Sequence, residues 1–370
     1  MQPFVFNALP GRVIFGSGTL SQVGDEIRGL GCGRALLLST PEQKMEVEKL
    51  AGQLGDLAVG IYANATMHTP TDVTLQALQM FRQTKADCVV ALGGGSTIGL
   101  AKAIALHTDA PQIVIPTTYA GSEATPIIGQ TENGIKTTQK TLKVLPEVIV
   151  YDVDLTLGLP AQMSVTSGLN AIAHAVEALY AKDANPLISM LAEQGIAAIA
   201  RALPRIIKNP DDREARSDAL YGAWACGVCL GAVGMSIHHK LCHTLGGSFS
   251  LPHAQTHTAV LPHAELRQRS VSTTHLADCS IWPKALGHPR ALRRLAWSKR
   301  TLQKRPTLHA RHLIGIHAPL SRMRLLNCSP TPGQEIGPNR NSLTQLAREE
   351  RQRSRHGTES PHPAPSPHHP

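Results

Sequence analysis

Four histidines and one asparagine have the types and spacing of a site that could hold a metal ion or transfer protons. His239 and His243 lie four residues apart, with His253 ten residues further on; upstream, Asn170 and His174 are also four apart. Residues at i and i+4 share a helix face, and imidazole is both a common metal ligand and an acid or base near pH 7. Asn170 stands where such a metal site would carry a carboxylate.

A glycine-rich turn predicts a second site, one that binds phosphate. An apolar run at residues 87–92 leads into the turn, and a helical pattern at residues 97–106 follows it. The turn consists of Gly93, Gly94, Gly95 and Ser96. Glycine lets the backbone approach a pyrophosphate, and a helix N-terminus offers free N–H groups. The spacing is not GxGxxG, so an ordinary Rossmann fold is not implied; a tight turn without a ligand is the alternative.

A polar loop after the next predicted strand, at residues 112–116, is expected beside this turn. Ligands of open α/β sheets bind at the carboxyl ends of the strands, so the two loops together predict a nucleotide site. The second loop offers four candidate contacts: Thr117, Thr118, Tyr119 and Ser122. The predicted strand ending at Ser39 has no carboxylate directly after it, which leaves NADH and NADPH both possible.

The order of elements predicts two domains. Residues 1–153 alternate strand-like apolar runs with helical patterns, which indicates a mostly parallel sheet covered on both faces. The predicted strands lie at residues 12–16, 35–39, 59–62, 87–92, 112–116 and 148–151. Residues 154–263 carry the longer periodicity of helices, which indicates an all-α domain. The predicted helices lie at residues 165–181, 186–207 and 218–246.

The last part of the chain, residues 264–370, differs in composition from the rest. It holds 18 Lys+Arg against 6 Asp+Glu and 12 of the 26 prolines, whereas residues 1–263 hold 18 Lys+Arg against 21 Asp+Glu. We expect an irregular, disordered tail. It lacks a recognisable nucleic-acid motif, so no specific nucleic-acid partner is expected. Our preferred interpretation is a reading-frame change near codon 264; a plain disordered extension is the alternative.

Neither a secretory leader nor a bilayer-spanning run is recognisable, so we expect no membrane partner. Seven scattered cysteines fit a reducing cytoplasm better than a disulfide framework. The pair Cys226 and Cys229 forms a CxxC, but no second pair completes a zinc site. We expect both thiols to pack inside a helix.

Three motifs in this order resemble the iron-containing alcohol dehydrogenase superfamily, which includes dehydroquinate synthase-like folds. They are the glycine-rich turn with its helix as far as Lys102, the polar loop as far as Glu123, and the histidines of the helical domain. The resemblance covers residues 1–263. It implies that Lys102 belongs to the cofactor site and that His243 lines the substrate and nicotinamide site. The metal positions that it implies are Asn170, His174, His239 and His253.

At two positions the sequence departs from the usual family pattern, and at both it resembles the maleylacetate reductase branch of the family. Gly99 stands where the phosphate-loop motif usually has aspartate, and Asn170 stands at the first metal position. The resemblance implies that NADH or NADPH reduces the C=C bond of maleylacetate, or of its chlorinated analogue, to 3-oxoadipate in aromatic degradation. We expect a small dicarboxylate substrate and a homodimer. The alternatives are a metal-dependent alcohol or polyol dehydrogenase of the same superfamily and an inactive product of a frameshifted gene.

The amide at position 170 leads to the prediction that no metal is required. An amide with three neutral imidazoles binds a divalent cation more weakly than a carboxylate would. Hydride addition to a conjugated C=C gives a delocalised enolate, which hydrogen-bond donors or histidinium groups can stabilise. The expected cationic and acid groups are His174, His239, His243 and His253. Ordinary core or surface roles are expected for His238, His257 and His263.

Overall fold

The computed structural model describes residues 3–132, 135–249 and 251–265. All of these residues belong to one compact unit, Met1–Leu308. The predicted tail therefore lies outside the described residues, apart from its first two positions. Its predicted disorder and the proposed reading-frame change stay predictions.

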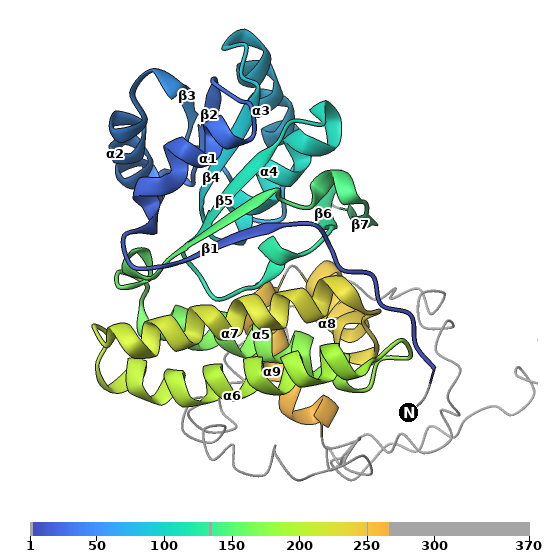
Figure 1. Cartoon of the computed structure of the whole chain (residues 1–370). Coiled ribbons are helices and arrows are strands. Elements are labelled where there is room, and N and C mark those ends of the chain that lie inside the picture. The colour runs from blue at the N-terminus through green and yellow to red at the C-terminus, as the bar shows by residue number, and fades with distance from the viewer. Residues whose placement is uncertain (1–2, 133–134, 250, 266–370) are drawn as a thin grey trace, which may run out of the picture. The chain divides into compact units, whose positions relative to one another are not determined.

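A six-stranded sheet forms the first layer, in the order β1-β8-β5-β4-β2-β3, and all its neighbouring strands pair in parallel (Figure 1). The strands are β1 (Arg12–Gly16), β2 (Ala35–Leu38), β3 (Ala58–Tyr62), β4 (Cys88–Gly93), β5 (Gln112–Pro116) and β8 (Val148–Asp152). Every residue of the four inner strands is buried. This is the pattern of parallel strands covered on both faces, and it confirms the predicted α/β layer.

Helices cover both faces of this sheet. Successive side chains of a strand point to opposite faces, so neighbouring residues of β2 join different cores. Leu37 joins a core with α1 (Val23–Gly29) and α2 (Lys44–Leu54). Its neighbours Leu36 and Leu38 join a second core, with α3 (Thr71–Gln83) and α4 (Gly95–Thr108). A hairpin of β6 (Ile127–Glu132) and β7 (Ile135–Lys140), which the sequence did not predict, follows β5.

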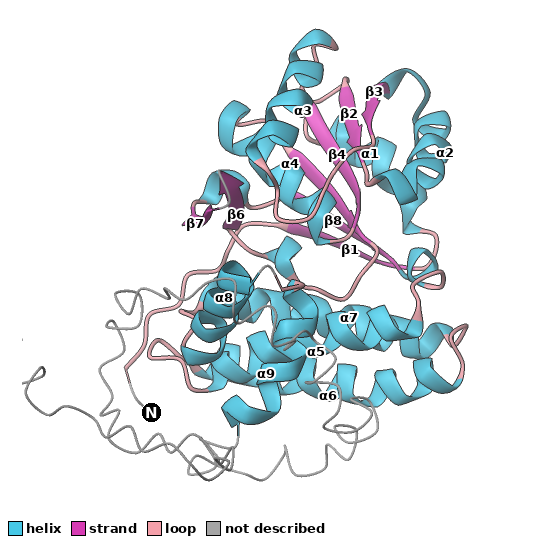
Figure 2. Cartoon of the chain, turned by 180° about the vertical axis from the view of Figure 1, so that it is seen from behind, coloured by secondary structure: helices cyan, strands magenta, loops and turns pink. Residues whose placement is uncertain are grey.

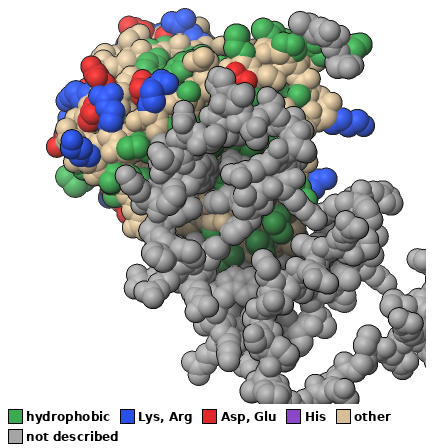
Figure 3. All heavy atoms as spheres, turned by 90° about the horizontal axis from the view of Figure 1, so that it is seen from below, with side chains coloured by type: hydrophobic (Ala, Val, Ile, Leu, Met, Phe, Trp, Pro, Cys, Tyr) green, Lys and Arg blue, Asp and Glu red, His purple; other side chains and the backbone are tan. Residues whose placement is uncertain are grey.

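The second layer is helical, as predicted (Figure 2). It contains α5 (Ala161–Leu179), α6 (Pro186–Lys208), α7 (Arg213–Ala232), α8 (Ile237–Phe249) and α9 (His253–Glu265). The side chains of Asn185 and Asp212 cap the N-termini of α6 and α7 by accepting hydrogen bonds from backbone N–H groups. Cys226 and Cys229 are buried within α7, as expected. On the face of the molecule in Figure 3, acidic and basic side chains lie interspersed over part of the described surface.

The predicted helix at residues 218–246 is wrong, because two helices occupy this stretch. α7 ends at Ala232, and its axis makes an angle of 97° with Ile237–Gly246 of α8. Side chains from outside this stretch bind its free N–H groups: Asp183 accepts from Gly234 N, and Glu177 of α5 accepts from Ser236 N. No single described helix is long and apolar enough to cross a membrane; this bent pair passes that test only jointly.

A buried arginine links the helical layer to the loop after β5. Arg216 of α7 is fully buried and donates to Tyr119 Oη at 3.2 Å and to Ser164 Oγ at 2.8 Å. Close backbone packing supports the same junction: a Cβ at Gly227 would lie 2.1 Å from the carbonyl oxygen of Gly121. The polar loop therefore rests on α7, and its conformation depends on the helical layer.

Candidate active site

The glycine-rich turn connects β4 to α4 and leaves the first turn of the helix open. Gly93 has φ of 156°, and a Cβ there would lie 2.4 Å from Thr97 Oγ1. At Gly94 a Cβ would lie 2.9 Å from Thr118 Cγ2, whereas nothing lies within 4 Å of one at Gly95. Residues 93 and 94 thus need glycine for packing, and Gly95 borders open space at the helix N-terminus. That combination suits a phosphate group.

Three strand ends meet around this turn. Thr117 N, after β5, donates to the Gly93 carbonyl at 3.1 Å, and Gln43 Nε2, after β2, donates to Thr117 Oγ1 at 3.0 Å. A cavity of about 400 Å³ lies beside Gln43 at the ends of β2 and β3. Its lining residues are Pro41, Lys44, Glu48, Ile61, Ala63 and Asn64. The two loops therefore lie together at the carboxyl edge of the sheet, as expected; that they bind a nucleotide stays a prediction.

Two predicted cofactor contacts turn out to lie inside the protein. Lys102 Nζ donates to the carbonyl oxygens of Ser122, Thr125 and Ile127 at 2.6–3.0 Å. Tyr119 is fully buried and accepts a hydrogen bond from Arg216. Both side chains are engaged in holding the polar loop, which argues against the prediction that they contact the cofactor directly. The Ser122 carbonyl also belongs to that support.

The buried lysine has a carboxylate neighbour, Glu123, at the end of the polar loop. Burial lowers the pKa of Lys102 to about 7, and the charge of Glu123 opposes this shift. Burial likewise raises the pKa of Glu123, while its hydrogen bond from Tyr151 Oη at 2.9 Å acts in the opposite direction. Lys102 lies under the polar loop and Glu123 stands at its end, and both are buried, so they fix its shape rather than face a ligand.

Gly99, which stands where the family pattern has aspartate, lies in a closely packed place in the structure. A Cβ at Gly99 would lie 2.4 Å from Thr69 Oγ1. Thr69 has φ of 47° and follows His68, at 70°, so two consecutive non-glycine residues adopt left-handed conformations. An aspartate at position 99 would displace this segment, which lies between β3 and α3.

The histidines come from three helices that pack together: α5 supplies His174, α8 supplies His239 and His243, and α9 supplies His253 and His257. A chain of hydrogen bonds runs through the buried part of this group. Glu177 Oε2 lies 2.7 Å from His239 Nδ1, and His239 Nε2 lies 2.7 Å from His174 Nδ1. His174 Nε2 then lies 3.4 Å from Asn170 Nδ2.

This chain determines which ring nitrogens carry protons. The carboxylate of Glu177 accepts the Nδ1 proton of His239, so neutral His239 accepts at Nε2 from His174 Nδ1. The Nε2 lone pair of His174 then faces the amide protons of Asn170. Every link has a donor and an acceptor when both rings are neutral and the amide is oriented with its nitrogen toward His174.

Burial opposes a positive charge on the buried rings, which argues against the prediction that His174 and His239 are cationic. Burial lowers the pKa of His174 and His239 well below the ordinary value, and neighbouring histidines lower it further. Burial also lowers the pKa of His257. Taking three adjacent imidazoles out of water disfavours the charged form of each. Only His243, which is exposed, and His253, which is partly buried, lie toward solvent.

His257 was expected to lie outside the site, and this is wrong. Its ring centroid lies 4.3 Å from that of His253 and 4.8 Å from that of His239. Glu177 was missed altogether, although it follows His174 by three residues and therefore shares its helix face. The side chain of His263 lies outside the described residues.

The residues at the family's metal positions do not fit a metal ion as they are arranged. Both ring nitrogens of His239 are hydrogen-bonded, to Glu177 and His174. Asn170 Oδ1 is buried without a partner, but it is a neutral amide oxygen where the family pattern has a carboxylate. Among the described residues, the histidine groups whose ligand atoms converge within 4.8 Å include neither His174 nor His239.

Comparison with known proteins shows to which family the chain belongs. Residues 10–153 match the family model of iron-containing alcohol dehydrogenase, and residues 164–289 match that of the C-terminal part of the Fe-containing alcohol dehydrogenase family. The chain belongs to the iron-containing alcohol dehydrogenase family. The family's enzymes are oxidoreductases, and the resemblance stated from the motifs is confirmed.

Within this family the chain is similar to several maleylacetate reductases. It is 62% identical to the one from Rhizobium sp. (strain MTP-10005) over 263 residues, which cover 71% of this chain and 75% of that protein. It is 60% identical to the one from Sphingobium indicum over 261 residues, covering 70% and 74%. The crystal structure of maleylacetate reductase from Agrobacterium tumefaciens superimposes with a TM-score of 0.76 at 53% identity, covering 83% of this chain and 93% of that chain.

Proposed function

We propose that the chain reduces the C=C bond of maleylacetate to give 3-oxoadipate, with NADH or NADPH as the hydride donor. The observation that carries the proposal is Asn170, an amide within a chain of neutral histidines where the family pattern has an aspartate. Eight relatives that are 52–62% identical and named maleylacetate reductase support it.

The bonding changes can be assigned to parts of the site. When bound, the nicotinamide supplies a hydride, which adds to the alkene carbon β to the ketone. The π electrons move to the ketone oxygen as an enolate, and a proton then adds to the α carbon. Overall, one hydride and one proton add across the C=C bond. His243 and His253 lie on the solvent side of the cluster and are our candidates for the proton donor.

The cofactor would be held at the carboxyl edge of the sheet. The turn at Gly93, Gly94, Gly95 and Ser96 and the N-terminus of α4 would bind its diphosphate, with Thr118 beside them. The cavity at Lys44 and Glu48 would take the adenosine end. An ammonium and a carboxylate together at this cavity leave NADH and NADPH both as candidates.

A metal ion is not required in this proposal. A simple ketone develops full charge on one oxygen, for which a Lewis acid is valuable. The conjugated alkene instead spreads the charge over an enolate, and hydrogen-bond donors are sufficient. Neutral His174 donates its one proton to His239 and accepts from Asn170, so the donors in this proposal would be His243 and His253, on the solvent side of the cluster. The use of chlorinated substrates and the homodimer remain predictions.

The test is NADH and NADPH oxidation by the full chain with maleylacetate, compared with simple alcohols and polyols in the reverse direction. We expect turnover of maleylacetate alone, and replacement of His243 or His253 by glutamine should reduce it. Turnover of alcohols that depends on added metal would favour the alcohol dehydrogenase alternative. Absence of turnover with any of these substrates would favour the alternative that the chain is an inactive product of a frameshifted gene.

A further inference from the structure

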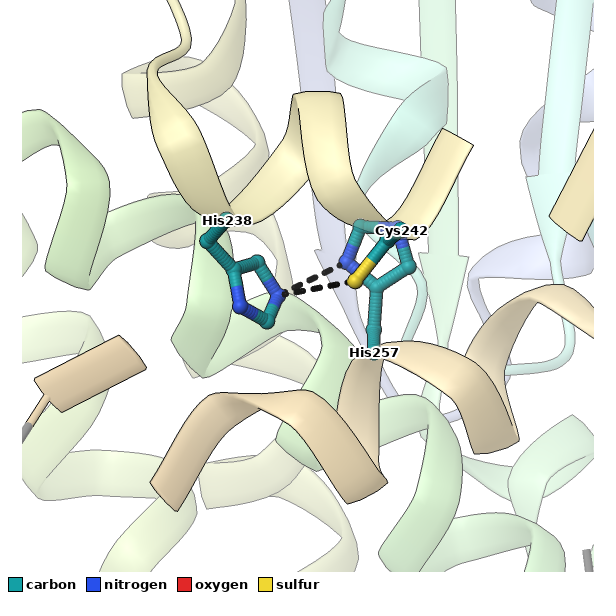
Figure 4. A group of neighbouring side chains, drawn as sticks. All are labelled: His238, Cys242 and His257. Atoms are coloured by element: carbon teal, nitrogen blue, oxygen red, sulfur yellow. Dashed lines mark hydrogen bonds between the residues drawn. The ribbon is translucent and has the colours of Figure 1, made fainter. Parts of the chain in front are cut away.

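A buried group of three side chains lies behind the proposed catalytic histidines. His238 and Cys242 lie on α8, one turn apart, and His257 lies on α9 (Figure 4). They are 1%, 2% and 0% exposed. His238 Nε2 lies 3.0 Å from His257 Nδ1 and 3.7 Å from Cys242 Sγ, and all three ligand atoms lie within 4.8 Å of one another.

These distances are close to the edges of a tetrahedral zinc site. With Zn–N near 2.0–2.1 Å and Zn–S near 2.3 Å, two imidazole nitrogens are about 3.3 Å apart, and a nitrogen and a thiolate about 3.6 Å. The two distances from His238 Nε2 differ from these values by only a few tenths of an ångström. Small side-chain movements would therefore let one ion contact all three ligands.

The group is also incompletely satisfied by hydrogen bonds. The second nitrogen of each ring, His238 Nδ1 and His257 Nε2, is buried and has no partner among the described residues. Buried polar atoms usually have partners. These two nitrogens are not the proposed ligand atoms, so they show only that the cluster is polar and not fully satisfied by its own hydrogen bonds. A polar cluster of this kind inside an apolar helical layer therefore needs a reason beyond packing.

The local charge would balance a divalent cation. Glu177 is fully buried and accepts a 2.6 Å hydrogen bond from His238 N. Burial, and after it the charge of Glu177, raise the pKa of the Cys242 thiol to about 12, so the thiolate would form only together with a bound cation. One thiolate and this carboxylate together would neutralise the ion. Two imidazoles and a thiolate select soft or borderline cations such as Zn²⁺ over Mg²⁺ or Ca²⁺, which prefer oxygen ligands.

We propose that His238, Cys242 and His257 form a binding site for a soft divalent cation such as Zn²⁺, joining α8 to α9. Binding displaces the thiol proton to solvent, with no change in oxidation state. None of the three residues occupies a family metal position, although the ring of His257 lies 4.3 Å from that of His253 and 4.8 Å from that of His239. The ion would stabilise the contact between α8 and α9, and turnover would not require it.

The test uses Co²⁺ as a spectroscopic substitute for Zn²⁺ on the full chain after chelator treatment. We expect one equivalent to bind with a thiolate-to-cobalt charge-transfer band, which Zn²⁺ abolishes by competition. Cys242→Ser should remove the band and weaken binding by about 100-fold or more, since even groups that only support a ligand change affinity 10–100-fold. The matched control is Cys229→Ser, a buried thiol of α7 whose Sγ lies 3.6 Å from the Ile188 carbonyl oxygen; it should keep the band.

Two outcomes would overturn the proposal. One is the absence of stoichiometric uptake by the wild-type chain. The other is uptake without a thiolate band, or with a band that survives in Cys242→Ser, because the ion would then sit elsewhere. If the serine variant fails to fold, His257→Gln, which keeps the thiol, replaces it; unchanged affinity in that variant would contradict the site.

Discussion

Glu177 accepts a 2.7 Å hydrogen bond from His239, and this contact orders the protons along the whole chain to Asn170. Glu177 also accepts from the backbone N–H groups of Ser236 and His238, at the start of α8. One carboxylate of α5 thus both positions α8 and selects the tautomer of its first catalytic-site histidine. The neutral chain that results replaces the charged donor set that a metal ion would need.

Replacement of Glu177 by glutamine should reduce kcat for maleylacetate about 10- to 100-fold, the range typical of groups that orient an active-site imidazole. The amide would place N–H protons where His239 now donates, so the rings would have to exchange tautomers. The pH profile of kcat should shift as well. Exposed Glu193 of α6 gives the matched control, Glu193→Gln, which should leave both unchanged. An unaltered pH profile in Glu177→Gln would refute the positioning role.

Low pH should destabilise the fold through the buried histidines. Burial lowers the pKa of His174, His239 and His257, so below about pH 6.5 the unfolded chain binds more protons than the folded one. Stability is therefore lost as the pH falls through 6.5, at a cost near 2 kcal/mol by pH 5 for each ring that stays neutral. Denaturant unfolding between pH 8 and 5 measures the slope. His257→Gln should make it shallower and exposed His107→Gln should not; a flat wild-type profile would be incompatible with neutral buried rings.

Gly99→Asp, which restores the usual family residue, should destabilise the chain rather than improve it. A Cβ at position 99 would lie 2.4 Å from Thr69 Oγ1, and overpacking of this kind costs about 1–3 kcal/mol. Thermal unfolding checks the prediction. Gly52→Ala, on an exposed position of α2 with nothing within 4 Å of the new Cβ, should be neutral or slightly stabilising. Equal stability of Gly99→Asp and the wild-type chain would count against the close packing of Thr69.

Cofactor binding should weaken when a side chain is added on the open side of the glycine-rich turn. Gly95→Ala adds a methyl group that meets no protein atom within 4 Å, so the melting temperature should change little. The same methyl group would occupy space that the diphosphate needs, and the KM for NADH should rise about tenfold or more. Isothermal titration with NADH provides a second readout. Tighter or unchanged cofactor binding would place the diphosphate elsewhere.

The sheet and the two loops could be predicted from the sequence because their signals are local. The run Ala35–Leu38 and the turn after β4 carry their own evidence in a few consecutive residues. The break between α7 and α8 could not, since Glu177 and Asp183 produce it from distant positions. The lowered pKa of His174 and the inward positions of Lys102 and Tyr119 could not be predicted either. All three result from burial, and burial follows from tertiary packing.

The central claim is that the site reduces its substrate without a metal ion. The most direct measurement is NADH oxidation with maleylacetate by the full chain after exhaustive chelation, before and after addition of Zn²⁺ or Fe²⁺. We predict full turnover by the chelated protein and no gain on adding either ion. Loss of activity on chelation, with recovery of tenfold or more on adding one equivalent of metal, would contradict the account.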